Sequence, residues 1–272
     1  MSAGIDIAEL AGHVKDGHSF HYPNGIHLDI PEFLTNIGIT KYIVLEFVVA
    51  AAMCAVFIPM AVKIKGGKPV KGRFWNLIEA FLLYLKDQVI VPSIGTKHAA
   101  PYVPYLWTLF FFILFCNLIG MLPWSGTPTS ALSVTAVLAL ATLGIVLITG
   151  MRMHGVKGYW LGLVPHLDVH PVMGCILKPL MFGIEVLGLI IKHGVLALRL
   201  MANMFAGHVA LAVIMTFISL SAGIIYLWIP VTVGSVALSL ALSVLELFIA
   251  FLQAYIFTLL SALFIGMSIH QH

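Results

Sequence analysis

The chain has 272 residues, of which 61% are hydrophobic and only 9% are charged, and its mean hydropathy is +1.05. Soluble domains carry about 25% charged residues, so this composition excludes an ordinary soluble protein and indicates a polytopic membrane protein. The formal net charge of +3 is small, and we expect no nucleic-acid partner. The three cysteines lie far apart in apolar surroundings, which predicts neither a disulfide framework nor a metal site.

Residues 1–40 are polar and contain Gly, His, Asp and Pro, so we expect an extramembrane N-terminal arm there. Residues 41–272 are expected to form a single transmembrane helical domain. The first span of this domain is predicted at 42–62, a segment long enough for the roughly 20 residues that a bilayer requires.

The middle of the chain alternates between basic turns and apolar segments. A basic turn at 63–73 is followed, over 74–91, by polar residues at helical spacing among apolar ones. This pattern predicts an amphipathic helix that lies along the membrane interface. Residues 103–123 and 130–150 are two further predicted spans, and 152–174 is expected to be a loop rich in Gly, Pro and His.

The orientation follows from the basic residues at the short loops, which concentrate on the inner side of membranes. The 63–73 turn carries five Lys or Arg residues and the 152–157 segment carries two, whereas the 124–129 turn carries none. These positions predict an outer N-terminus and an inner C-terminus.

The last hundred residues contain two apolar stretches, 176–219 and 226–269, that are too long for ordinary spans. As one helix each would measure roughly 65 Å, about twice the hydrocarbon thickness. Each stretch therefore either breaks into two spans or forms one steeply tilted helix, and the lack of turn residues in the middle favours the tilted helix. The predicted fold is all-α and polytopic, with about five membrane-crossing helices, an interfacial helix and a terminal hairpin over 176–269.

Polar residues follow one face of each predicted long helix. The first row repeats at intervals of seven and four, and the second at intervals of three and four, so each row shares a helix face. Such rows face other helices or water-filled cavities, because lipid cannot satisfy them. The serines also fit a simpler role in helix packing. The first row is Glu185, Lys192, Arg199 and Asn203, and the second is Ser235, Ser239, Ser243, Glu246, Ala250 and Gln253.

Arg199 is the most informative of these residues. An arginine at bilayer depth costs about 3 kcal/mol or more, so such residues are rare and usually functional. Because its charge is permanent, Arg199 cannot carry protons by titrating, but it can attract or release a carboxylate and repel other cations. We therefore interpret it as a control point on an ion path.

Several motifs resemble those of one family, subunit a of rotary F-type ATP synthases. The motifs that carry the resemblance are Arg199-Leu-Met-Ala-Asn203-Met-Phe-Ala-Gly207-His208, Leu245-Glu246 leading to Gln253-Ala-Tyr-Ile-Phe257, Asn117-Leu-Ile-Gly120-Met-Leu-Pro123, and the Pro128-Thr129 turn followed by Thr135. The resemblance is strong over 105–125 and 176–269. It departs from the usual pattern at two positions, where His208 and Glu246 stand exchanged, which suggests that the two act as a unit.

The resemblance implies a stator that forms two proton half-channels against a ring of c subunits, each with a membrane-buried carboxylate. It implies contacts with the b-subunit peripheral stalk, the remaining ATP synthase subunits and membrane lipids, in the plasma (inner) membrane of a bacterium. Arg199 would separate the half-channels and control the ring carboxylate. Glu185, Asn203, His208, Glu246 and Gln253 would line the path, with Lys192, Ser239 and Ser243 as secondary candidates.

The sequence shows no phosphate-binding loop, nucleophile motif or zinc motif. We therefore expect no catalytic site, cofactor or metal. His13, His18, His21 and His27 lack regular ligand spacing, and His166, Asp168 and His170 fit a solvated loop better than a metal site. One alternative function is a stand-alone ion-coupled secondary transporter with Arg199 as its substrate anchor. Transporters usually show internal repeats or broken helices, and neither is evident here.

Overall fold

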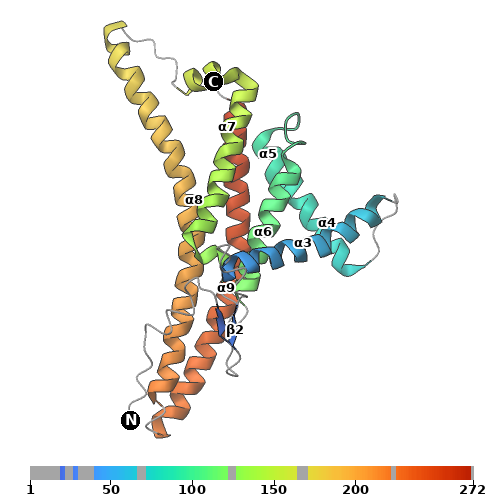
Figure 1. Ribbon diagram of the computed structural model, residues 1–272, viewed down its shortest axis with the longest axis vertical. Helices are drawn as coiled ribbons and strands as arrows, with labels where there is room; N and C mark the ends of the chain where they lie inside the picture. Colours follow the sequence, from blue (N-terminus) through green and yellow to red (C-terminus); the bar gives the residue numbers. More distant parts are fainter. Residues whose placement is uncertain are drawn as a thin grey trace. The chain divides into compact units, whose positions relative to one another are not determined.

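The computed structural model describes residues 19–21, 27–29, 40–65, 72–121, 127–163, 171–221 and 225–270. Their secondary structure is almost entirely helical, which confirms the predicted fold class (Figure 1). The helices are α3 (Lys41–Lys65), α4 (Arg73–Tyr84), η1 (Leu85–Ile90), α5 (Val91–Ile94), α6 (Val103–Gly120), η2 (Pro128–Ser130), α7 (Leu132–Gly162), α8 (Pro171–Ser221) and α9 (Ile225–Ile269). In the arm, strands β1 (Ser19–His21) and β2 (His27–Asp29) pair antiparallel.

Within the described residues, five helices are long and apolar enough to cross a membrane, as predicted. The candidate spans are Lys41–Ile64, Val103–Gly120, Leu132–Gly162, Leu177–Ile218 and Trp228–Ile269. The last two comprise 42 residues each, and the helices that contain them, α8 and α9, run without a break. The expectation of continuous long helices is therefore confirmed.

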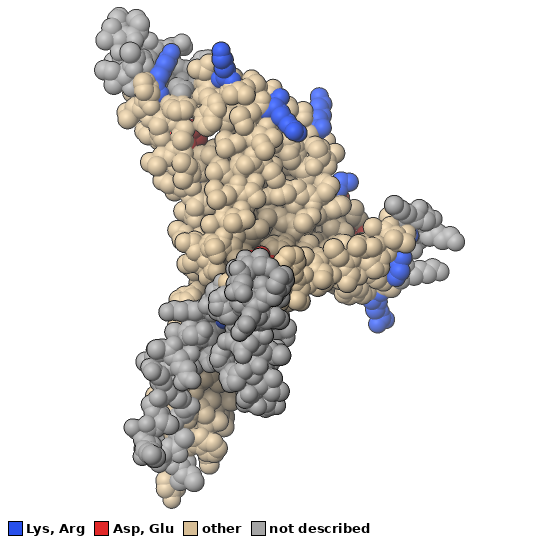
Figure 2. Space-filling view, viewed as in Figure 1, with Lys and Arg blue, Asp and Glu red and all other residues tan. Residues whose placement is uncertain are grey.

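Helices α8 and α9 continue through Pro179 and Pro230. Membrane helices tolerate proline because neighbouring groups satisfy the freed backbone carbonyl. Only 11% of the most apolar window of either helix is buried, so most of their side chains are available to lipid or to partner subunits. The face of the molecule in Figure 2 is accordingly dominated by uncharged side chains, with few charged ones.

The loop predicted at 152–174 is wrong at both ends, because α7 continues to Gly162 and α8 already begins at Pro171. The chain bends at Gly155, whose φ of 74° is a left-handed conformation that favours glycine. The polar residues that suggested a turn therefore lie on a helix with one kink. His166, Asp168 and His170 lie outside the described residues.

The amphipathic segment predicted at 74–91 is helical, from α4 through η1 to α5. Its middle part, Leu85–Ile90, has the wider π-helical hydrogen-bond pattern, a register change that occurs mostly as a single turn within α-helices. Pro92 follows at the start of α5, where a residue without a backbone N–H is tolerated.

The described residues form two compact units. Unit 1 comprises those within Met1–Val70, Phe111–Val134 and Leu200–Ala254, and unit 2 those within Lys71–Phe110, Thr135–Arg199 and Tyr255–His272. In unit 1, α3 contacts α6 through Phe57 and Phe111, whose ring centroids lie 4.8 Å apart. The Tyr42 hydroxyl of α3 also lies 3.4 Å from the Ser130 hydroxyl of η2.

In unit 2, buried and half-buried side chains make hydrogen bonds from one helix to another. Trp107 of α6 donates its indole N–H to the Leu82 carbonyl at 3.0 Å. The Tyr105 hydroxyl lies 2.9 Å from that of Thr142 on α7, and Ser268 of α9 donates to the Val146 carbonyl at 2.8 Å. Each contact removes a polar group from lipid, which cannot bond to it.

In unit 2, Gly266 of α9 lies so close to the backbone of α5 that the effect of one added methyl group can be predicted. A Cβ at Gly266 of α9 would overlap the carbonyl oxygen of Ser93, and a backbone carbonyl cannot rotate away as a side chain can. We expect Gly266→Ala to destabilise the protein by about 1–3 kcal/mol, measured as a lower unfolding temperature in detergent. Gly144→Ala on α7 is the matched control, since no described atom lies within 4 Å of its Cβ position. Equal unfolding temperatures for the two variants would contradict this packing.

Candidate functional site

Three predicted path residues of unit 1 meet in one cavity of about 230 Å³ between α8 and α9. Asn203 and His208 line it from α8, and Glu246 lines it from α9. All three side chains are half-buried. We call this space the Glu246 cavity, and it confines a base and an acid that lie 38 positions apart in the sequence.

Gly207 of α8 lets the Glu246 carboxylate lie directly against that helix. A Cβ at position 207 would collide with Oε1 of Glu246. This oxygen is buried and has no hydrogen-bond partner among the described residues. A buried carboxylate oxygen is costly unless it is solvated or paired. The cavity has room for several water molecules, since each occupies about 30 Å³ in the liquid.

A hydrogen-bonded chain of polar residues extends this site. The Thr127 hydroxyl, immediately before η2, hydrogen bonds to Nε2 of His208. Thr129 donates to Oδ1 of Asn117 at 2.7 Å, and Nδ2 of Asn117 donates to the Ala250 carbonyl of α9 at 3.4 Å. Asn117 and Thr129 are fully buried, so these bonds satisfy groups that lipid would leave unpaired.

Neither Thr127 nor Thr129 was predicted as a site residue from the sequence. Asn117 and Thr129 were noted only as parts of motifs, and the turn that holds both threonines was otherwise notable only for its lack of basic residues. A buried asparagine in an otherwise apolar span is the signal that could have indicated the cluster.

The remaining predicted residues of α9 differ in their surroundings. Gln253 is buried, with 5% of its surface exposed, and lies one helical turn beyond Ala250. Ser239 donates its hydroxyl proton to the Val236 carbonyl, and Ser243 donates to the Ser239 carbonyl, both at 2.9 Å. These bonds lie within α9, as is common for serines in membrane helices, so neither proton is available to another helix.

Arg199 lies near the centre of its candidate span, as the twenty-third of the 42 residues from Leu177 to Ile218. Its side chain is half-buried. Among its neighbours on α8, Leu198 is exposed, whereas Leu196 and Leu200 are buried. Its guanidinium makes no hydrogen bond or ion pair with any described residue. A charge at this depth needs a partner, and the described part of the chain does not provide one.

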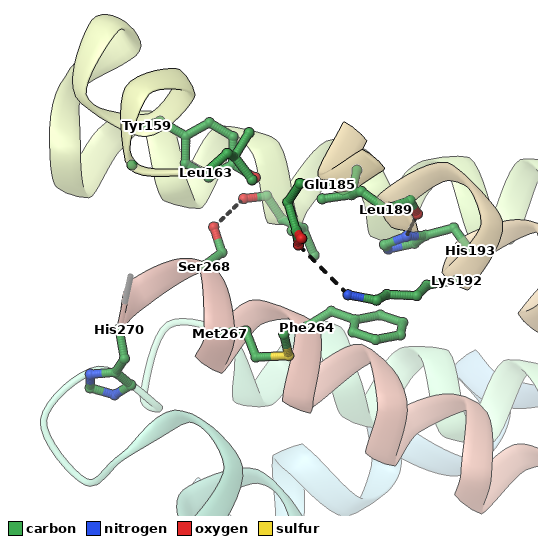
Figure 3. A pocket seen from close by; sticks show the side chains of 12 residues that line it. Tyr159, Leu163, Glu185, Leu189, Lys192, His193, Phe264, Met267, Ser268 and His270 are labelled. Carbon is green, nitrogen blue, oxygen red and sulfur yellow. Dashed lines mark hydrogen bonds and ion pairs between the residues drawn. The ribbon is translucent and has the colours of Figure 1, made fainter. Parts of the chain in front are cut away.

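A second cavity, of about 320 Å³, lies in unit 2 (Figure 3). Glu185 and Lys192 face each other on α8, with 3.8 Å between Oε1 and Nζ. Their side chains are 44% and 43% exposed, so this ion pair contributes little stability. Tyr159 of α7 and Phe264, Ser268 and His270 from the C-terminal end of α9 complete the polar and aromatic lining. We call this space the Glu185 cavity.

The structure therefore groups the predicted residues into two sets, each within its own unit. Asn203, His208 and Glu246 share one cavity, and Glu185 and Lys192 share the other, while Arg199 and Gln253 line neither. Ionisable side chains within membrane spans are by default candidates for functional sites. Five candidate spans together with two such sets define a multi-pass membrane protein of the ion-translocating class.

Comparison with known proteins gives the family. The family described as ATP synthase A chain matches residues 43–266. ATP synthase subunit a of Myxococcus xanthus is 38% identical over 244 residues, which cover 87% of this chain and 76% of that protein. The subunit a of Chlorobium phaeobacteroides is 37% identical over 264 residues, covering 94% and 73%, and that of Anaeromyxobacter dehalogenans is 37% identical over 281 residues, covering 97% and 71%.

The chain belongs to the family of ATP synthase subunit a, the proton-translocating stator subunit of the Fo membrane sector. It is a multi-pass integral membrane protein, it partners other ATP synthase subunits, and it is not catalytic on its own. This membership favours the stator over the stand-alone transporter that the sequence had left as an alternative.

The close approach of Glu246 to α8 predicts the effect of one added methyl group. Gly207→Ala should displace the carboxylate rather than the backbone, because Oε1 is the far end of a flexible side chain. We expect proton flux through the assembled complex to fall by about tenfold, since small displacements of a reacting group cost this much or more. The unfolding temperature should not change.

In a Glu246→Ala background, Gly207→Ala should have no further effect on flux. Gly183→Ala is the matched control on α8, because no described atom lies within 4 Å of its Cβ position. An equal loss of flux with and without Glu246 would show that the methyl group acts through something other than the carboxylate.

Proposed function

We propose that this subunit forms two proton half-channels against a ring of c subunits and that Arg199 controls the ionisation of the ring carboxylates. The observation that carries the proposal is the position of Arg199, near the centre of a 42-residue span and without a partner among the described residues. Its cost of about 3 kcal/mol or more at bilayer depth is offset if each passing ring carboxylate pairs with it.

The guanidinium fits this role in chemistry and in position. It stays charged while carboxylates gain and lose protons, and it pairs well with their planar geometry. On α8 it lies at the edge of an exposed apolar stripe that includes Val195, Leu198 and Phe205. A ring of apolar helices that covered this stripe would bring its carboxylates to the guanidinium. The fixed positive charge would then prevent protons from passing directly between the half-channels.

The lengths of α8 and α9 support a curved partner. A 42-residue helix measures about 63 Å and fits a hydrocarbon layer of about 30 Å only when it is steeply tilted. Hydrophobic mismatch alone produces modest tilts. The cylindrical outer wall of a c ring is a surface along which two tilted helices can lie.

We assign the Glu246 cavity to the outer half-channel. His208, which lines it, hydrogen bonds to Thr127 in the turn without basic residues, which the positive-inside rule places outside. Histidine exchanges protons near neutral pH, and the buried Glu246 oxygen adjoins space for water. Asn203 lines the same cavity four residues after Arg199.

We assign the Glu185 cavity to the inner half-channel. Its lining includes Gly162 and Leu163 at the end of α7, which follow the basic residues Arg152 and Lys157. The positive-inside rule places that segment in the cytoplasm. The same rule gives an outer N-terminus and an inner C-terminus in the plasma membrane of a bacterium, the kind of organism in which the similar subunits occur.

A stator must be held against the turning ring. We therefore include the b-subunit peripheral stalk among its partners, together with the remaining subunits of the complex. Lipid covers those apolar faces of the spans that no subunit covers, as the low charge of the surface suggests.

Replacement of Arg199 tests the proposal. Arg199→Ala and Arg199→Gln should abolish ATP-driven proton pumping and ATP synthesis in membrane vesicles while the complex still assembles. Passive proton conductance should not fall, because the charge that separates the half-channels is gone. Arg199→Lys should restore coupled transport poorly, since a compact ammonium lacks the planar fork. Normal pumping by the alanine variant would refute the stator mechanism.

The shared cavity of His208 and Glu246 gives a second test. His208→Ala and Glu246→Ala should each slow proton flux. The reciprocal exchange, His208→Glu with Glu246→His, should recover more flux than the two single exchanges predict when their effects are added. Simple additivity in this double-mutant cycle would show that the two side chains work independently.

A further inference from the structure

His193 is a buried polar residue that the path described so far does not use. It lies on α8, one residue after Lys192, and only 4% of its surface is exposed. Its Nδ1 lies 2.9 Å from the Leu189 carbonyl oxygen, four residues earlier on the helix (Figure 3). A carbonyl can only accept a hydrogen bond, so Nδ1 carries the proton and donates it. This bond fixes the tautomer of the neutral ring, and Nε2 is left with a free lone pair.

The Nε2 atom is buried and has no hydrogen-bond partner among the described residues. His193 lines the Glu185 cavity, whose volume is about 320 Å³. The other titratable groups that line this cavity are Glu185 and Lys192 of α8, Tyr159 of α7, and His270 at the end of α9. Glu185 faces Lys192 at 3.8 Å, so its carboxylate already has a partner. His270 is exposed, and its Nε2 lies 3.1 Å from the Ile94 carbonyl oxygen. Among the described residues that line the cavity, the buried base without a hydrogen-bond partner is therefore Nε2 of His193.

Packing alone does not explain a histidine at this position. The ring centroid lies 4.8 Å from that of Phe264, with the two planes inclined by 42°. A phenylalanine would make this contact without leaving a buried nitrogen unsatisfied. An imidazole adds only the ability to accept and release a proton, which it does most readily near neutral pH.

We propose that His193 is a proton-transfer residue of the path that the Glu185 cavity serves. Nε2 accepts a proton from cavity water, the ring becomes an imidazolium, and the same proton leaves Nε2 for the next acceptor. Nδ1 keeps its own proton and its bond to Leu189 throughout, so the ring returns to its starting tautomer. Arg199 lies six residues further along α8, about 9 Å along the helix axis and about 120° around it, so several water molecules would have to connect the two side chains.

This inference rests on the proposed function, since the final acceptor is the carboxylate of the partner ring as it passes Arg199. It adds a residue that the resemblance did not indicate. Because the Glu185 cavity is assigned to the inner half-channel, these steps run in the direction of ATP hydrolysis. In the direction of ATP synthesis the same steps run in reverse, and the proton balance at Nε2 is unchanged.

The test uses the assembled ATP synthase in sealed vesicles. ATP-driven proton pumping is measured on the complete complex, and passive proton conductance is measured after the soluble ATPase sector has been removed. His193→Phe keeps the ring and its contact with Phe264, and His193→Gln keeps polarity, but neither exchanges protons. We expect both variants to lose about a hundredfold in conductance, the lower end of the range for removal of a proton-transfer group. Gly188→Ala is the control on the same helix, because no described atom lies within 4 Å of its Cβ position and it does not line the cavity, and it should conduct normally.

Chemical rescue separates proton transfer from a structural role. In His193→Ala, added imidazole should restore conductance with saturation, whereas pyrazole should not, because it has the same shape but does not accept protons near neutral pH. Conductance of His193→Phe at the level of the unsubstituted protein would overturn the proposal, as would equal rescue by both compounds or no rescue by imidazole. Failure of the half-channel proposal can be distinguished from failure of the His193 proposal. Arg199→Ala should abolish pumping without a loss of passive conductance, whereas the His193 variants should lower both pumping and passive conductance.

Discussion

The structure depends on one constraint, the cost of placing a charge or an unpaired polar group in hydrocarbon. The described part of the chain meets it in two ways and leaves one charge unpaired. Glu185 and Lys192 neutralise each other at 3.8 Å. Asn117 and its partners form a closed hydrogen-bonded cluster. Arg199 is left without a partner among the described residues, and we propose that the carboxylates of the partner ring offset its cost.

The two cavities solve a related problem with different chemistry. The Glu246 cavity places a carboxylate against bare backbone at Gly207, so the acid lies close to α8 without a bond to it. The Glu185 cavity pairs its carboxylate with a lysine and leaves a histidine nitrogen free. Among the described residues, each cavity thus holds one buried ionisable atom without a hydrogen-bond partner, and such an atom can exchange protons with water more readily than a paired one.

Much of the fold could be predicted from the sequence because apolar length decides which segments span a membrane. The 42-residue spans follow from uninterrupted apolar stretches. The extension of α7 beyond Gly155 could not be predicted, since glycine, histidine and lysine indicate a turn as readily as a kinked helix. Glu246 and Arg199 were identifiable as residues that are costly in lipid. Their surroundings were not, because the contact of Glu246 with Gly207 depends on the register between two helices, which no local pattern encodes.

The unbroken course of α8 has a consequence for how this protein can vary during evolution. Each residue of a helix turns the following ones by about 100° and advances them by about 1.5 Å. One inserted or deleted residue between Glu185 and Arg199 would turn the guanidinium away from its side of the helix, and a change of seven would restore the side but shift the charge by about 10 Å. A change of length in this segment would therefore displace several groups at once, whereas a substitution alters only one, and differences in length among homologues should accumulate outside it.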